Sequence, residues 1–104
     1  MSQTLVYITA GSHDEALALG RALVEARLAA CANVLGAITS VYWWEGKLDQ
    51  GNEVALIVKT KTSLVDRVVA LVGEKHSYDC PCVVALPIEN GNPAFLKWIE
   101  NETL

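Results

Sequence analysis

The sequence lacks most of the features that mark nucleic-acid, membrane or secreted proteins. Its 104 residues include 8 lysines and arginines against 12 aspartates and glutamates, which leaves a net charge of −4. A chain without a basic cluster binds nucleic acid and acidic membrane surfaces poorly. No apolar run approaches the ~20 residues that span a bilayer. The first residues lack the basic and apolar regions of a secretory signal. We therefore expect no nucleic-acid partner, no membrane partner and no export signal.

Cysteine and catalytic motifs are also scarce. Cys31, Cys80 and Cys82 are odd in number, and a single residue separates the last two. That pattern argues against a disulfide framework and indicates reduced thiols, and hence a cytoplasmic protein. The sequence shows no phosphate-binding glycine loop, HExxH helix or Ser-His-Asp set, so we expect no enzyme.

Hydrophobic residues, in contrast, are abundant. They make up 52% of a chain whose length suits one domain over residues 1–104, and a monomer of this size would struggle to bury them all. Tyr42, Trp43 and Trp44 are consecutive, so in a strand their rings must point to both faces. We expect the domain's own helices to cover one face and a partner chain to cover the other. These features predict an oligomer.

The hydrophobic pattern divides the chain into alternating strands and helices. The order β-α-β-β-α-β, followed by a short C-terminal helix, predicts an α+β ferredoxin-like sandwich with two helices over one face of a four-stranded sheet. The apolar uncovered face is expected to pack against other subunits. The expected elements are strands over 4–10, 31–44, 53–60 and 83–88, helices from 12, 63 and 93, and a polar loop over 45–52.

Local residue choices sharpen these boundaries. Ser12 followed by Glu15 fits a capping box, and Ser63 with Asp66 is expected to cap the second helix in the same way. Gly20 inside the first helix indicates close packing against the sheet. Further expectations are a bulge at Gly36, an edge strand or bulge at Pro87, a helix start at Asn92-Pro93, and inward-facing Phe95, Trp98 and Ile99.

Several phrases of the sequence, taken together, resemble one known family. They are Arg27-Leu-Ala-Ala-Cys-Ala-Asn33, Tyr42-Trp-Trp-Glu-Gly-Lys47, Lys59-Thr60, His76-Ser-Tyr-Asp-Cys-Pro81, Leu86-Pro-Ile88 and Gly91-Asn92. The family is CutA, the divalent-cation tolerance proteins, and the resemblance covers almost the whole chain. It implies a ferredoxin-like protomer in a tight homotrimer that binds divalent metals, notably copper, and contributes to metal tolerance. The family is similar in architecture to the PII signalling proteins, which bind metabolites in clefts between subunits.

One segment departs from the family pattern. Where the family usually has His-Pro-Tyr-Glu, a variable residue and Pro-Glu, this chain has His76-Ser-Tyr-Asp-Cys-Pro-Cys82. Thiolates and imidazole suit Cu(I), Zn(II) or Hg(II), so His76, Cys80 and Cys82 are candidate ligands for copper or another soft metal ion. The structural alternative is that the cysteines are small hydrophobes and that His76 complements a helix dipole. We expect a core position for Cys31, since small apolar residues surround it.

A second candidate site comprises aromatic and charged residues near the predicted hairpin. Tyr42, Trp44, Glu53, Lys59 and Tyr78 are candidates to line an intersubunit cleft that holds a small ligand. The alternative is that these rings pack in an interface and that Glu53 and Lys59 form an ordinary cross-strand charge pattern. The sequence thus leaves two hypotheses: a homotrimeric cytoplasmic metal-binding protein of metal tolerance, and a PII-like trimer that binds a metabolite or partner protein.

Overall fold

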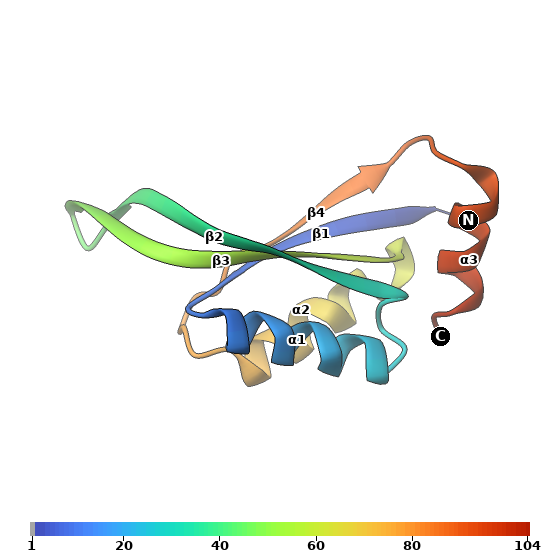
Figure 1. The fold of residues 1–104 in the computed structure, drawn as a ribbon, viewed down its shortest axis with the longest axis horizontal. Helices are drawn as coiled ribbons and strands as arrows, with labels where there is room; N and C mark the ends of the chain where they lie inside the picture. Colours follow the sequence, from blue (N-terminus) through green and yellow to red (C-terminus); the bar gives the residue numbers. More distant parts are fainter. Residues whose placement is uncertain (1) are drawn as a thin grey trace.

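A four-stranded antiparallel sheet with helices on one face forms the centre of the computed structural model, which describes residues 2–104 (Figure 1). The strand order is β2-β3-β1-β4. This arrangement confirms the predicted α+β ferredoxin-like fold. The elements are β1 (Gln3–Ala10), α1 (His13–Glu25), β2 (Cys31–Trp44), β3 (Lys47–Lys61), α2 (Val65–Lys75), β4 (Val83–Ile88) and α3 (Pro93–Asn101).

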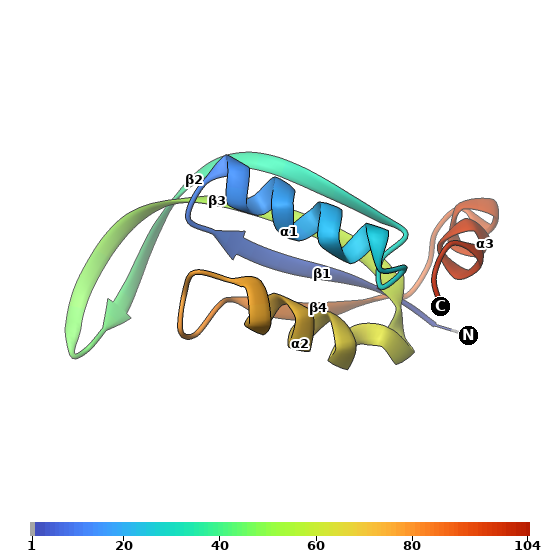
Figure 2. The ribbon, with the colours of Figure 1, turned by 90° about the horizontal axis from the view of Figure 1, so that it is seen from below.

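The core lies between the sheet and the pair of helices α1 and α2, which lie side by side across one face (Figure 2). Alternation along β1 and β3 sends every second side chain into this layer, and α1 meets it with a stripe at helical spacing. Gly20 sits where α1 comes closest to β2: a Cβ there would lie 2.9 Å from the Cβ of Ala32. The predicted role of Gly20 is confirmed.

The β2–β3 hairpin is longer than predicted. The expected loop over 45–52 is wrong, because strand pairing continues to Trp44 opposite Lys47 and leaves a two-residue turn at Glu45 and Gly46. Both turn residues have positive φ, 51° and 79°, as a type I′ hairpin turn requires. Figure 1 shows the hairpin projecting beyond both helices, in a molecule 44 Å along its longest axis.

This projection changes the expected surroundings of the three consecutive rings. Tyr42, Trp43 and Trp44 are 39%, 74% and 54% exposed, because the chain's own helices do not extend beneath the hairpin end. The prediction that these helices cover one face of the Tyr42–Trp44 stretch is therefore wrong. The predicted bulge in β2 is confirmed: the register shifts between Val34 and Gly36, and Gly36 has φ 118°.

The two helix starts differ from each other. The Ser12 hydroxyl accepts the Glu15 amide of α1 at 3.1 Å, as predicted, but the Glu15 carboxylate accepts the Gly11 amide rather than that of Ser12. The predicted cap by Ser63 is wrong. Residues 62–64 form a 3₁₀ turn, and α2 begins at Val65 without a side-chain cap.

The C-terminal segment closes the far end of the sheet. Asn92 caps α3 through the Ala94 amide and Pro93 stands at its start, as predicted. Of the three residues expected to face inward, only Ile99 is buried, while Phe95 and Trp98 are exposed. The inward prediction is wrong for these two because α3 packs across the end of the sheet and not over its face (Figure 1).

The sheet face opposite α1 and α2 is apolar. Leu5 and Tyr7 of β1 lie beside Leu86 and Val84 of the edge strand β4, which also carries Pro87 as predicted. Val84 and Leu86 are exposed. Within residues 2–104 this face is left without a helix, so its apolar side chains meet solvent in a single chain.

Candidate functional site

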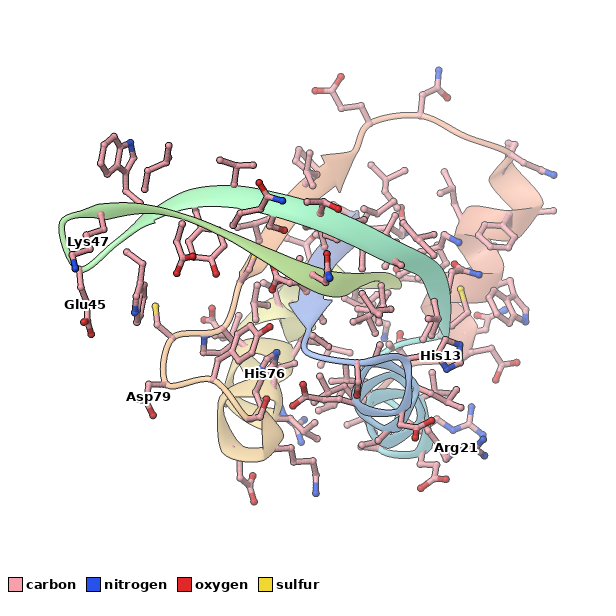
Figure 3. All side chains as sticks on the ribbon, turned by 60° about the vertical axis from the view of Figure 1, so that its left-hand side comes forward. His13, Arg21, Glu45, Lys47, His76 and Asp79 are labelled. Atoms are coloured by element: carbon pink, nitrogen blue, oxygen red, sulfur yellow. The ribbon has the colours of Figure 1, made fainter. Side chains whose placement is uncertain are left out.

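A cavity of about 580 Å³ lies where the hairpin passes the loop between α2 and β4. In Figure 3, Asp79 lies on this loop, below the hairpin, whose tip carries Glu45 and Lys47. The cavity wall has three parts: Tyr7 and Thr9 of β1; Ile38, Ser40, Val41, Tyr42, Trp44, Asp49 and Glu53 of the hairpin; and Tyr78, Asp79, Cys80 and Cys82 of the loop.

Strand alternation puts every lining residue of the hairpin except Val41 on one face of it. Tyr42 pairs with Asp49 across the hairpin, and Trp44 lies two residues further along the same face. Trp43 points to the opposite face and is absent from the cavity wall. Consecutive tryptophans therefore have different environments.

His76 anchors the loop to the sheet. Its side chain is fully buried, and its Nε2 lies 2.7 Å from the carbonyl oxygen of Thr9. Its Nδ1 accepts the amide of Tyr78 at 3.0 Å. Since Nδ1 is an acceptor, Nε2 carries the proton and donates to Thr9. Both ring nitrogens are therefore occupied by the backbone.

Glu15 holds the same loop from α1. Its carboxylate accepts the Ser77 amide at 2.8 Å and the Ser77 hydroxyl at 3.0 Å, and it also accepts the Gly11 amide at 2.8 Å. Burial raises the pKa of this carboxyl, but the hydrogen bonds from Gly11 and Ser77, with the nearby His76, outweigh that effect and leave the pKa below its usual 4.5. The loop is thus fixed at its start by an ionised group.

Tyr78 places a hydroxyl on the cavity wall. Its O–H donates to Glu53 at 3.1 Å, joining the loop to β3. Burial first, and then the hydrogen bond and negative charge of Glu53, raise the pKa of Tyr78 to about 12. Glu15 and Tyr42 add to the same effect. The hydroxyl therefore stays protonated at neutral pH and keeps donating to Glu53.

The predicted metal ligands lie on the same loop but are not equivalent. Cys80 and Cys82 are free thiols that both line the cavity, whereas His76 lies behind it with both nitrogens engaged. Among residues 2–104, His, Cys, Asp and Glu form no group of three or more that could hold a metal ion. The ligand set His76, Cys80 and Cys82 stays a prediction, and the geometry favours the two thiols.

Cys31 lies at the other end of the sheet. It pairs with Lys59, which pairs with Leu5, whereas the carbonyl of Cys82 accepts the Thr9 amide at 3.4 Å. The two rows of paired residues are four residues apart, which at ~3.3 Å per residue is about 13 Å along the strands. Cys31 is half-buried on the open face and does not belong to the core, so the predicted core position is wrong.

Four of the five predicted cleft residues share this cavity: Tyr42, Trp44, Glu53 and Tyr78. Lys59 is the exception. It lies six residues along β3 from Glu53, donates to Asn33 at 2.7 Å and stands 5.7 Å from the centre of the Phe95 ring. Within one chain, Lys59 and Glu53 therefore neither form an ion pair nor line the same cavity.

Two roles are missed by sequence reasoning: Asp49 as a cavity residue, and Glu15, expected only in a capping box, as the residue that holds the loop. Asp49 falls in the loop expected over 45–52, and only the two-residue turn at Glu45-Gly46 could have shown that it faces Tyr42 on a paired strand. The contact between Glu15 and Ser77 joins residues 62 positions apart, and a single sequence carries no signal for it. Within the described residues no helix is long and apolar enough to cross a membrane.

The chain is similar over nearly its whole length to one family. The sequence model described as "CutA1 divalent ion tolerance protein" matches residues 4–102. A divalent-cation tolerance protein CutA of Archaeoglobus fulgidus is 45% identical over 95 residues, covering 91% of this chain and 92% of that protein. The chloroplastic CutA 1 of rice is 42% identical over 99 residues, covering 95% of this chain and 56% of that protein.

Solved structures give the same result. The crystal structure of CutA1 from Oryza sativa aligns with a TM-score of 0.97 at 40% identity, over 100% of this chain and 95% of the other. The periplasmic CutA of Archaeoglobus fulgidus aligns with a TM-score of 0.93 at 43% identity, over 96% and 97%. The chain spans little more than half the length of the plant and mammalian relatives it matches.

Proposed function

Since this chain belongs to the CutA1 divalent ion tolerance family, we propose that it acts in metal-ion tolerance as a cytoplasmic homotrimer that binds soft metal ions, copper foremost. Its relatives carry names of tolerance proteins and no name of a catalytic family, which supports a non-enzymatic role. The free cysteines support the cytoplasmic location. The names of relatives do not specify it, since one is named chloroplastic and another periplasmic.

One observation supports the metal site above others: the two thiols lie together on the cavity wall. Cys80 ends a bend over residues 77–80 and Cys82 directly precedes β4, so their Cα atoms are at most about 7 Å apart. A linear two-thiolate site with metal–sulfur bonds of ~2.3 Å needs a sulfur separation of about 4.6 Å, which this spacing allows. The donor set therefore fits a soft ion such as Cu(I).

The apolar sheet face supports the homotrimer. It would leave Leu35, Val84 and Leu86 in water in a single chain, and the hairpin end would expose Trp43 as well. Exposed apolar area of this extent is typical of subunit interfaces. We therefore place the contacts between subunits on this face and along the hairpin.

Native mass spectrometry of the reduced protein, with and without Cu(I), tests both statements. We expect a species of three chains that takes up copper, and a Cys80→Ser/Cys82→Ser variant that remains a trimer without uptake. Cys31→Ser is the matched control, because Cys31 lies about 13 Å along the strands from the other thiols, and it should bind copper like the wild type. Equal uptake by the double variant would place the site elsewhere, and a wild-type protein that ignores copper would refute the metal function.

The cavity itself favours a second candidate function, a PII-like trimer that binds a small metabolite. Its volume of about 580 Å³ lies within the range of small-molecule sites, ~300–1,000 Å³. Four of the residues predicted to line such a cleft converge on it.

A further inference from the structure

The loop between β4 and α3 carries an asparagine directly followed by a glycine. Strand pairing ends at Ile88 and α3 begins at Pro93, so residues 89–92 belong to neither element. Asn90 and Gly91 are both exposed in this loop. Figure 1 shows the loop rising from the end of β4, at the end of the molecule opposite the hairpin. Asn90 is one of five asparagines in the chain and the only one that precedes glycine.

The Asn90 side chain lies against the main-chain nitrogen that follows it. The Gly91 amide donates to Asn90 Oδ1 at 2.9 Å. The side-chain carbon Cγ is one C=O bond of ~1.23 Å from that oxygen, so the hydrogen bond holds Cγ close to the Gly91 nitrogen. Glycine has no Cβ beside this nitrogen, and its backbone changes conformation at little steric cost. An electrophilic carbon and a nucleophilic nitrogen are thus placed together in a segment outside the hydrogen-bonded sheet and helix.

We propose that Asn90 is a modification site at which the protein deamidates without an enzyme. The Gly91 nitrogen bonds to Cγ of Asn90, and its proton passes through water to the side-chain amide, which leaves as ammonia. Water then opens the resulting five-membered succinimide at either carbonyl, which yields aspartate or isoaspartate at position 90. One water is gained and one ammonia is lost, and neither an oxidant nor a cofactor takes part.

The other asparagines lack this combination. Asn92 stands only two residues away, but Pro93 follows it, and a proline nitrogen carries no proton to lose. Asn33 and Asn52 lie in β2 and β3, and Asn101 ends α3. In these elements main-chain hydrogen bonds hold the backbone, and the residue that follows has a side chain that hinders the attack. The chain therefore contains four internal controls for one reactive position.

Deamidation changes both the charge and the path of this loop. Either product carries a carboxylate where the amide stood, which takes the net charge of the chain from −4 to −5. The new charge lies just before α3, whose N-terminus favours a negative group. Isoaspartate also adds one carbon to the main chain two residues before Asn92, which caps α3 through the Ala94 amide. The modification thus acts on the junction of β4 and α3 and leaves Cys80 and Cys82 unchanged.

Peptide mapping of the assembled, reduced protein during incubation at neutral pH tests the proposal. Conversion appears as a mass gain equal to the difference between water and ammonia, and chromatography separates the aspartyl and isoaspartyl peptides. We expect Asn90 to convert at least about tenfold faster than each of the other asparagines. A synthetic peptide over residues 86–95 gives the rate without the fold, and the protein should remain within about tenfold of it. A smaller preference for Asn90 would overturn the proposal, and so would a slower protein, because the fold or a subunit contact would then protect the loop.

Two glycines give a matched pair of variants. Gly91→Ala should slow the conversion of Asn90 about tenfold, because a methyl group then stands beside the attacking nitrogen. Its Cβ would meet Leu96 Cδ2 at 3.5 Å, an ordinary contact, so the fold is kept. Gly73→Ala changes a glycine of α2 whose added Cβ would have no such neighbour within 4 Å, and it should leave the rate unchanged. Equal rates in Gly91→Ala and the wild type would contradict the assigned nucleophile.

The thiol variant separates this proposal from the metal function. Cys80→Ser/Cys82→Ser should convert Asn90 at the wild-type rate while losing copper uptake. A wild-type protein that binds no copper but deamidates as described refutes only the metal function. One that binds copper and keeps Asn90 intact refutes only the modification site.

Discussion

Replacing Glu15 by alanine tests how the loop that carries Tyr78, Cys80 and Cys82 is held in position. The carboxylate accepts three hydrogen bonds, two from Ser77 and one from Gly11, at 2.8–3.0 Å. Its side chain is 18% exposed. Bonds to a buried charged group are worth about 1.5–3 kcal/mol each, but water can reach these donors in the variant. We therefore expect Glu15→Ala to lower the free energy of unfolding by about 2 kcal/mol in total at pH 7.

The effect should depend on pH in a defined direction. The folded pKa of Glu15 lies below its usual value of 4.5, so its contribution is fully present above pH 4.5 and is lost as the pH falls through the lower folded value. The difference in stability between wild type and Glu15→Ala should accordingly be largest near neutral pH and shrink below pH 4.5. The Ser12 hydroxyl still caps α1 in the variant, so the loss comes mainly from the loop.

Urea unfolding of both proteins at pH 7 and pH 4, at one fixed protein concentration, measures this difference. Asp14→Ala is the matched control, because Asp14 is also acidic and in the first turn of α1 but is exposed. It should cost no more than about 0.5 kcal/mol. We also expect Cys80 and Cys82 to react faster with a disulfide reagent in Glu15→Ala than in wild type. Unchanged stability, or a loss that is the same at both pH values, would refute the role of Glu15.

Two further predictions concern the backbone around the sheet. Gly20→Ala should destabilise the protein by about 1–2 kcal/mol despite the better helix propensity of alanine, because the new Cβ meets the Cβ of Ala32 at 2.9 Å. Thermal unfolding measures this loss, and adding Ala32→Gly should recover part of it. A double variant whose two effects simply add would contradict the contact. Glu45→Asn should stabilise the protein by about 0.5–1 kcal/mol, since Glu45 has φ 51° next to Gly46 and asparagine tolerates that region better; an unchanged or lower midpoint in urea would argue against the turn geometry.

Local signals in the sequence were sufficient for much of the fold. Ser12 and Asn92 are helix caps that act on amides two or three residues away, so their roles depend on few distant contacts. Gly20 and Gly36 were interpretable because a glycine inside a regular element needs a physical reason, which was close packing in one case and a positive φ in the other.

The wrong predictions concern segments whose residue types reflect their exposure to solvent more than their backbone conformation. Residues 47–52 are polar because the hairpin end projects into solvent, and this composition concealed a paired strand. Phe95 and Trp98 were expected to be inward for the opposite reason, since apolar residues at helical spacing do not reveal which side of a helix the body covers. In both cases the missing information was the position of the element relative to the rest of the fold.

The sequence identified most residues of the candidate site but not which of them lie together. The sequence groups Tyr78 with the hairpin residues Tyr42, Trp44 and Glu53 in one candidate cleft, but it assigns Cys80 and Cys82 to a separate metal site. The structure places Tyr78 and the thiols on the same cavity wall as Trp44, because the long hairpin curves past the loop. The two candidate sites join because Cys80 and Cys82 line the same cavity as Tyr78 and Glu53, which is a tertiary arrangement that no local pattern predicts.

Strand alternation gives Trp43 and Trp44 different surroundings on the two faces of the hairpin. Trp44 turns its ring to the cavity with the thiols and carboxylates, while Trp43 turns its ring to the other face, where Leu48 pairs with it across the strands. A one-residue slip of β2 against β3 would exchange the two faces, so register determines which ring lines the cavity and which lies on the face that continues the helix-covered side of the sheet. The Glu45-Gly46 turn fixes that register. The spacing of two residues in this turn therefore matters as much to the site as the side chains that line it.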